Sequence, residues 1–154
     1  MPNNKDYEDL LQHFNDAGVK YLVVGAYAVI YYTEPRYTKD IDIWVEPSRE
    51  NAEKVYAALR AFGAPVADLT IEDLTNLDMV YQMGIEPNRI DVLMGVTGLQ
   101  FDKAWETRVA LQYGDTATHI LDLDSLIEAK KAAGRKQDEI DLEVLELAKK
   151  SKKK

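Results

Sequence analysis

Apolar positions along the chain follow two patterns: short runs rich in β-branched residues, and stripes with helical spacing. The short runs are bounded by turn residues and predict strands. They lie at residues 20–24, 38–46, 79–83, 89–94, 109–113 and 118–121. The helical stripes lie at residues 4–17, 27–32, 48–62, 101–108 and 122–133, with a short helix around 71–74 and a last helix that places Ile140, Val144, Leu147 and Ala148 on one face.

Capping residues support several of these helix boundaries. A side-chain oxygen at the N-cap accepts a hydrogen bond from a free backbone N–H of the first turn. The candidate N-caps are Asn3 or Asn4, Ser48, and Asp122 or Asp124. A glycine in the left-handed conformation commonly ends a helix. The candidate stops are Gly18, Gly63 and Gly134.

The predicted strand at 38–46 carries two carboxylates in an otherwise apolar, β-branched run. Successive strand side chains point to opposite faces, so Asp40 and Asp42 share a face with Trp44, and their Cα atoms lie about 6.6–7 Å apart. Two like charges this close repel unless water or a cation lies between them. Aspartate is depleted in strands, so the pair indicates a functional site. The alternative is the solvated face of an antiparallel sheet.

A strand, a glycine and a helix precede this pair. The apolar strand at 20–24 leads into Gly25 and Ala26 and then the helix at 27–32. Glycine lets the backbone approach an anion closely, and the amides of the following helix N-terminus point toward it. The segment therefore predicts a phosphate-binding turn. Arg36, Thr38 and Lys39 lead into the acidic strand and lie either in a solvated loop or against phosphate or carboxylate groups.

A third acid, Asp91, lies in the second strand of the predicted hairpin. Its neighbours are Ile90, Val92 and Leu93, an apolar setting in which an unpaired carboxylate is costly. Neighbouring strands lie about 4.8 Å apart, so Asp91 beside the other two acids would complete a three-carboxylate cluster. The alternatives are that Asp91 faces water or pairs with Arg89.

Composition narrows the chemistry. The chain has 154 residues, which suits one domain. It has no cysteine and only two histidines, so any metal would be oxygen-bound. The net charge is −8 although five of the last six residues are lysines, so the body is more acidic still. Broad binding of long nucleic acid is therefore disfavoured.

Targeting signals are absent from the sequence. No apolar run approaches the roughly 18 residues of a membrane span, and the N-terminus lacks an apolar secretory segment. We expect a cytoplasmic protein with no membrane association.

Paired carboxylates on a strand suit magnesium. Mg²⁺ is typically held by one or two carboxylates together with substrate phosphates. In two-metal phosphoryl transfer, ions about 3.5–4 Å apart hold the attacking and leaving oxygens, and a third acid can share a metal or take the proton. An EF-hand needs further oxygen ligands and a glycine after the pair, where this chain has Ile43, Trp44 and Val45. Haloacid dehalogenase phosphatases usually have Thr or Val at the position of Trp44, and glycosyltransferases with this motif are usually much longer.

The ordered motifs resemble the DNA polymerase β-type nucleotidyltransferase superfamily, among its small prokaryotic members related to abortive-infection toxin nucleotidyltransferases. The matching stretches are 24–29 (Val-Gly-Ala-Tyr-Ala-Val), 36–43 (Arg-Tyr-Thr-Lys-Asp-Ile-Asp-Ile), 89–93 (Arg-Ile-Asp-Val-Leu), and 124–130 with 134–138 near the C-terminus. The resemblance spans nearly the whole chain in order. One departure is Ala26, where many relatives have serine or glycine.

The resemblance implies an α+β (mixed α/β) fold, a small mixed β-sheet with helices packed on it and a C-terminal helical pair. We expect a single domain over 1–148, with the sheet core at about 19–121, the C-terminal helices at about 122–148, and a lysine-rich frayed tail at 149–154. The implied activity is transfer of a nucleoside monophosphate from a nucleoside triphosphate, with release of pyrophosphate.

The resemblance also implies roles for individual residues. Asp40 and Asp42 would bind Mg²⁺ or Mn²⁺, and Asp91 would complete the metal site and activate the acceptor. Lys130 and Asp138 would support nucleotide binding and catalysis, although by charge alone the junction at 130–143 is a solvated helix surface. The nucleotide-binding residues would be Gly25, Ala26, Arg36, Thr38 and Lys39.

Two further functions stay open at this point: an inactive module, and a toxin that transfers nucleotides to tRNA or protein. A catalytically inactive partner-binding or antitoxin module is favoured by Ala26, whose side chain cannot donate a hydrogen bond to phosphate. The three retained acids favour an enzyme. The acceptor is a small molecule, a tRNA or a protein, and a protein partner of the toxin–antitoxin type is a further expectation.

Overall fold

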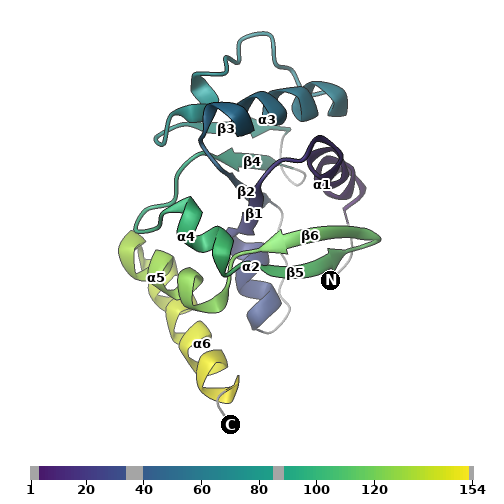
Figure 1. The fold of residues 1–154 in the computed structure, drawn as a ribbon. Helices are drawn as coiled ribbons and strands as arrows, with labels where there is room; N and C mark the ends of the chain where they lie inside the picture. Colours follow the sequence, from purple (N-terminus) through teal and green to yellow (C-terminus); the bar gives the residue numbers. More distant parts are fainter. Residues whose placement is uncertain (1–3, 34–39, 85–88, 153–154) are drawn as a thin grey trace.

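Six strands form one mixed sheet in the order β3-β4-β2-β1-β6-β5 (Figure 1). The structure is a computed structural model and describes residues 4–33, 40–84 and 89–152. The strands are β1 (Tyr21–Val24), β2 (Ile41–Val45), β3 (Val80–Met83), β4 (Ile90–Leu93), β5 (Val109–Tyr113) and β6 (Thr116–Ile120). The helices are α1 (Lys5–Ala17), α2 (Gly25–Tyr32), α3 (Arg49–Phe62), η1 (Asp73–Thr75), α4 (Phe101–Glu106), α5 (Leu123–Ala133) and α6 (Lys136–Lys152). The predicted mixed sheet with packed helices is confirmed.

The two central strands set the geometry of the site. β2 is antiparallel to β1 and parallel to β4, and β1 is parallel to β6. The β2–β4 register places Asp42 opposite Asp91 and Trp44 opposite Leu93. Chain order does not reveal this neighbour, because 44 residues of helix, loop and edge strand separate β2 from β4.

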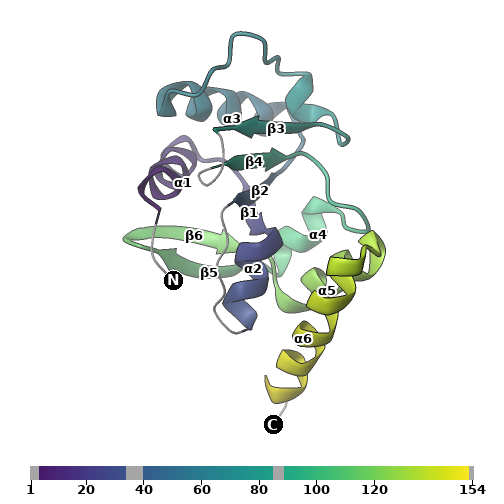
Figure 2. The ribbon, with the colours of Figure 1, turned by 180° about the vertical axis from the view of Figure 1, so that it is seen from behind.

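The helices divide into two groups around the sheet. α1 packs against α3 near the β3–β4 end, whereas α5 and α6 pack together at the opposite end of the molecule (Figures 1 and 2). Trp44 on β2 packs edge-to-face on Phe101 of α4, with ring centroids 5.1 Å apart. The sheet face that carries Asp42 is therefore covered by α4 at Trp44, so this face is not uniformly solvated.

Most predicted boundaries hold within a few residues. Asn4, Ser48 and Asp122 cap α1, α3 and α5, and Gly18, Gly63 and Gly134 end these helices in the left-handed conformation. The acidic strand starts at Ile41 within the described residues, α4 ends two residues earlier than predicted, and β6 starts two residues earlier. The last difference arises because β6 pairs with β5 from Thr116 onward.

The C-terminal helix differs most from expectation. α6 continues to Lys152, so residues 149–152 are helical and not frayed. Lysines near a helix C-terminus interact favourably with its dipole, and Lys149 Nζ also lies 2.7 Å from Asp124 Oδ1 of α5. The predicted apolar face is exposed at Ile140, Val144 and Leu147.

No helix among the described residues is both long enough and apolar enough to span a membrane.

Candidate active site

The strand register brings two of the predicted acids together. Asp42 on β2 lies opposite Asp91 on β4, and Asp40 lies just before β2. Asp91 is only 7% exposed. The prediction that Asp91 stands beside the acidic strand is therefore confirmed.

Asp42 has a raised carboxyl pKa. Burial disfavours its charged form most strongly, followed by the negative charge of Asp91 and a hydrogen bond with that residue, so that the pKa of Asp42 rises from 3.8 to about 6. Asp40 raises it further and Arg89 opposes the shift. The Asp42 carboxyl group therefore holds its proton more tightly than an isolated aspartate does, and a bound cation would oppose this shift.

Arg89 lies between the acids and changes the predicted cluster. Its Nη2 lies 3.0 Å from Asp40 Oδ2, and its Nε lies 3.1 Å from Asp91 Oδ1. Among the described residues, no three Asp, Glu, His or Cys side chains converge as a metal site. The expected three-carboxylate metal centre is thus not assembled in this conformation, because the guanidinium neutralises two of its members. Asp91 therefore pairs with Arg89, as the alternative predicted, and it also lies beside Asp42.

The acids nevertheless suit a hard cation. Asp40 Oδ1 is buried and has no hydrogen-bond partner within residues 4–33, 40–84 and 89–152. Carboxylate oxygens are the ligands that Mg²⁺ and Mn²⁺ prefer. The unsatisfied oxygen of Asp40 and the raised pKa of Asp42 both indicate that negative charge is under-compensated here.

Gly25 is required by this geometry. Its φ is +67°, and a Cβ atom at this position would overlap Asp42 Oδ2. α2 begins at Gly25, and the preceding Val24 supplies no side-chain cap. The backbone N–H groups at this helix start are therefore not satisfied by an N-cap side chain, as a phosphate-binding turn needs. Ala26 lies in the same first turn.

The C-terminal helices bury a second ionic cluster. Asp138 is 1% exposed and accepts hydrogen bonds from Lys130 Nζ at 3.1 Å and Arg135 Nε at 2.6 Å. Lys130 Nζ also lies 3.3 Å from Asp141 Oδ2, and Asp141 is equally buried. Hydrogen bonds from Arg135, and then from Lys130, lower the pKa of Asp138 from 3.8 to about 2. The interpretation of this junction as a solvated surface is therefore wrong for the two aspartates.

Sequence reasoning missed two members of this cluster, Arg135 and Asp141. Both were within the charge-rich junction, but their helical spacing from Asp138 carried the useful signal. Residues three apart on a helix share a face, so Asp138 and Asp141 can meet one lysine of the neighbouring helix.

One cavity joins the two clusters. It measures about 440 Å³ and is lined on one side by Gly25 and Asp42, and on the other by Lys130, Arg135 and Asp138. Residues of β4, its following loop and α5, together with Val24 and Leu121, form the rest of the wall. The fold thus places an acidic strand and two cationic side chains around one space, a suitable arrangement for a polyanion bound with a cation. The predicted residues Arg36, Thr38 and Lys39 lie outside the described residues.

Two solved structures share the fold of this chain. The lincosamide antibiotic adenylyltransferase LnuA, bound to lincomycin, matches with a TM-score of 0.56 and 16% identity over 94% of this chain and 98% of its own. The chain has a nucleotidyltransferase fold. The antibiotic-resistance factor ANT(2'')-Ia matches with a TM-score of 0.54 and 12% identity over 95% of this chain and 82% of its own. No protein-family model and no curated protein sequence matches the chain.

This fold brings Gly25, Asp42 and the C-terminal helices around one cavity although they are far apart in sequence. The toxin-related branch that the motifs resemble stays a prediction, because the structural likeness concerns the fold.

Proposed function

We propose that the protein transfers a nucleoside monophosphate from a nucleoside triphosphate to a small-molecule acceptor and releases pyrophosphate. The cavity that joins Asp42 to Lys130 and Arg135 carries this proposal. A triphosphate needs cations for its negative charge, and a reacting phosphoryl group needs bound metal. The two sides of the cavity offer both.

Asp40 and Asp42 would hold Mg²⁺ or Mn²⁺, and Asp91 would complete the site once Arg89 moves aside. The ion would neutralise charge on the α-phosphate and on the leaving pyrophosphate. The unpartnered Asp40 Oδ1 and the like-charge pairing of Asp42 with Asp91 support this ligand set.

The nucleotide would lie between α2 and α5. The backbone at Gly25 and Ala26 would donate hydrogen bonds to the triphosphate, and Lys130 and Arg135 would contact it from the opposite wall. Asp138 would position both cations through the hydrogen bonds described above. The motif also assigns Arg36, Thr38 and Lys39 to phosphate contacts.

The chemical step is a balanced substitution at phosphorus. The acceptor hydroxyl oxygen forms a bond to the α-phosphorus, and the bond between that phosphorus and the bridging oxygen breaks. Pyrophosphate leaves with the electron pair. The hydroxyl proton passes to Asp91, whose partner Asp42 already shares a hydrogen bond with it.

A small molecule is the favoured acceptor. LnuA is a lincosamide adenylyltransferase and was solved with lincomycin, and ANT(2'')-Ia is an antibiotic-resistance factor. The net charge of −8 disfavours a long nucleic acid. A tRNA or protein acceptor, and a partner of the toxin–antitoxin type, are competing outcomes of the acceptor search. The inactive module is not favoured, because the acid that lines the nucleotide cavity, Asp42, is retained together with Asp91 opposite it and Asp40 just before β2.

A thermal-shift titration with Mg²⁺ and each of the four ribonucleoside triphosphates tests the nucleotide site. Ligand at about 100 times its dissociation constant stabilises the fold by roughly 2.7 kcal/mol. We expect a magnesium-dependent shift that an Asp40→Asn, Asp42→Asn variant loses, and pyrophosphate release once an acceptor is added. Equal shifts in both proteins would overturn the assigned metal ligands, and binding without any consumption of nucleotide would support the inactive module.

A further inference from the structure

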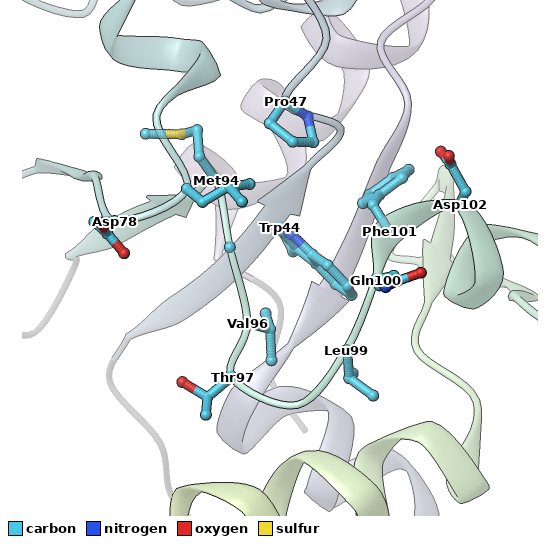
Figure 3. A pocket seen from close by; sticks show the side chains of 12 residues that line it. Trp44, Pro47, Asp78, Met94, Val96, Thr97, Leu99, Gln100, Phe101 and Asp102 are labelled. Atoms are coloured by element: carbon cyan, nitrogen blue, oxygen red, sulfur yellow. The ribbon is translucent and has the colours of Figure 1, made fainter.

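A second cavity adjoins the proposed nucleotide site. It measures about 490 Å³ and lies among the end of β2, the loop that follows β4, and the start of α4 (Figure 3). Val96 and Thr97 line both this cavity and the one that contains Asp42. The two spaces therefore share a wall. A volume of this size is typical of a small-molecule site.

Trp44 links this cavity to the reacting centre. It follows Asp42 by two residues on β2, so both side chains lie on one face of the sheet, about 6.6–7 Å apart along the strand. In Figure 3 the indole lies at the centre of the view, with Asp78 on one side and Asp102 on the other. A molecule resting on Trp44 is within reach of a phosphoryl group held at Asp42.

The indole leaves a hydrogen-bonding group unused. Trp44 is 1% exposed, and its Nε1 is buried without a hydrogen-bond partner in the described part of the chain. A buried donor without an acceptor is unfavourable. The ring, together with Phe101 and Met94, provides an apolar surface.

The charge of the cavity has one sign. Asp78 and Asp102 line it, and neither has an ion-pair partner among the described residues. None of the described lining residues is Lys, Arg or His. Leu77, 62% exposed, adds an apolar edge. The lining thus favours a ligand with both a positive charge and an apolar part.

The loop that walls the cavity is tightly seated. A Cβ atom at Gly95 would overlap the backbone carbonyl oxygen of Leu77, so only glycine allows these two segments to approach so closely. The loop before β3 and the loop after β4, which both line the cavity, therefore lie in close backbone contact.

We propose that this second cavity binds the acceptor, a small amphipathic molecule that carries a protonated amine and a hydroxyl. The inference rests on the proposed nucleotidyl transfer. Asp78 and Asp102, on opposite sides of the indole, give the cavity the negative charge that attracts the amine, and Trp44, Met94 and Phe101 contact the apolar part. The hydroxyl points past Val96 and Thr97 toward the α-phosphorus, where it replaces pyrophosphate.

A matched pair of probes tests the cavity without requiring catalysis. N-octyl-N-methylglucamine has an apolar chain, several hydroxyls and a protonated amine, whereas octanoyl-N-methylglucamide is its neutral amide counterpart. Both are titrated below their micelle concentrations while the indole N–H resonance of Trp44 is followed by NMR. A Trp105→Phe variant assigns that resonance, because the chain has only two tryptophans.

We expect the amine to shift the Trp44 resonance and to bind at least about tenfold more tightly than the amide. An Asp78→Asn, Asp102→Asn variant should lose this preference and bind both probes alike. Its matched control is Asp68→Asn, Asp115→Asn, which removes two exposed charges that do not line the cavity and should keep the preference.

The results separate this inference from the proposed function. A magnesium-dependent triphosphate shift of the wild-type protein with no amine preference, or with an unmoved Trp44 resonance, would overturn the acceptor cavity alone. Selective amine binding at Trp44 without any triphosphate shift would support the cavity and overturn nucleotidyl transfer.

Discussion

The two charged clusters of this protein shift the pKa values of their aspartates in opposite directions. At β2 and β4, burial and the charge of a second carboxylate raise the pKa of Asp42 to about 6. Between α5 and α6, hydrogen bonds from Arg135 and Lys130 lower the pKa of Asp138 to about 2. Asp138 is buried and Asp42 is half-buried, yet it is the pKa of Asp138 that falls, so burial alone does not decide their ionisation.

The difference indicates which cluster is complete. Asp138 has its cations within the chain, and its charged form is stabilised by them. Asp42 faces another carboxylate, and Arg89 contacts Asp40 and Asp91. The strand cluster thus retains uncompensated negative charge that a metal would neutralise, whereas the helical cluster is satisfied and supports the fold while it positions cations toward the cavity.

Removing a strand carboxylate should have the largest effect on activity. We expect Asp42→Asn to reduce nucleotidyl transfer at least about a hundredfold, because a metal ligand is lost. The free energy of unfolding at pH 8 should be unchanged or higher by about 1 kcal/mol, since a like-charge contact is relieved. Pyrophosphate release and urea unfolding measure the two effects, and a large loss of stability would contradict the comparison.

Removing the central cation of the cluster between α5 and α6 should mainly reduce stability, whereas loss of the strand carboxylate mainly reduces activity. Lys130→Met removes the buried cation that Asp138 and Asp141 share, so we expect a loss of about 3 kcal/mol in the free energy of unfolding. Lys131→Met is the control. Lys131 Nζ lies 3.7 Å from Oε1 of the exposed Glu146, and such surface pairs contribute about 0–1 kcal/mol. Equal losses in urea unfolding would show that the buried cluster is not structural.

The contact between Gly25 and Asp42 can be broken by one methyl group. We expect Gly25→Ala to destabilise the protein by about 2–3 kcal/mol, because the left-handed backbone and an overlap with a carboxylate oxygen both oppose the new side chain. Gly18→Ala shares the positive φ but meets open space, and should cost only about 1 kcal/mol. Comparable thermal unfolding of the two variants would mean that the tight approach to Asp42 is unimportant.

The two aspartates should give stability profiles of opposite slope with pH. Asp138 has a lowered pKa, so its stabilisation is present above pH 4 and is lost as pH falls from about 4 toward 2. Asp42 has a raised pKa, so its contribution to stability falls as pH rises from about 4 through 6. Each effect should be on the order of 2–3 kcal/mol. Urea unfolding across pH 2–8 measures both effects. Asp138→Asn should remove the loss of stability below pH 4, and Asp42→Asn should remove the loss of stability as pH rises from about 4 through 6.

Arg89 should act as the competitor of the metal, with the smallest expected effect. Arg89→Gln frees Asp40 and Asp91 from the guanidinium, so we expect half-maximal stabilisation at about tenfold lower Mg²⁺, equivalent to about 1.4 kcal/mol. Arg108→Gln is a surface control whose side chain stacks on Trp105. An unchanged magnesium midpoint would show that the guanidinium does not occupy the space that the ion needs.

Local patterns in the sequence were enough to predict the helices and strands and most residues of the candidate site. Side-chain alternation put Asp40, Asp42 and Trp44 on one face of a strand, and the caps Asn4, Ser48 and Asp122 marked helix starts, because these depend on neighbouring residues alone. The apolar surroundings of Asp91 indicated that it needs a partner.

Only the tertiary structure decided which groups meet. The parallel pairing of β2 with β4 puts Asp42 opposite Asp91. It also places Arg89 against Asp91, the residue expected to be the third metal ligand. Packing of α5 on α6 buries Asp138 and Asp141 at a junction whose composition predicts a solvated surface. Such contacts depend on strand order and helix packing over long sequence separations, and residue types alone do not specify them.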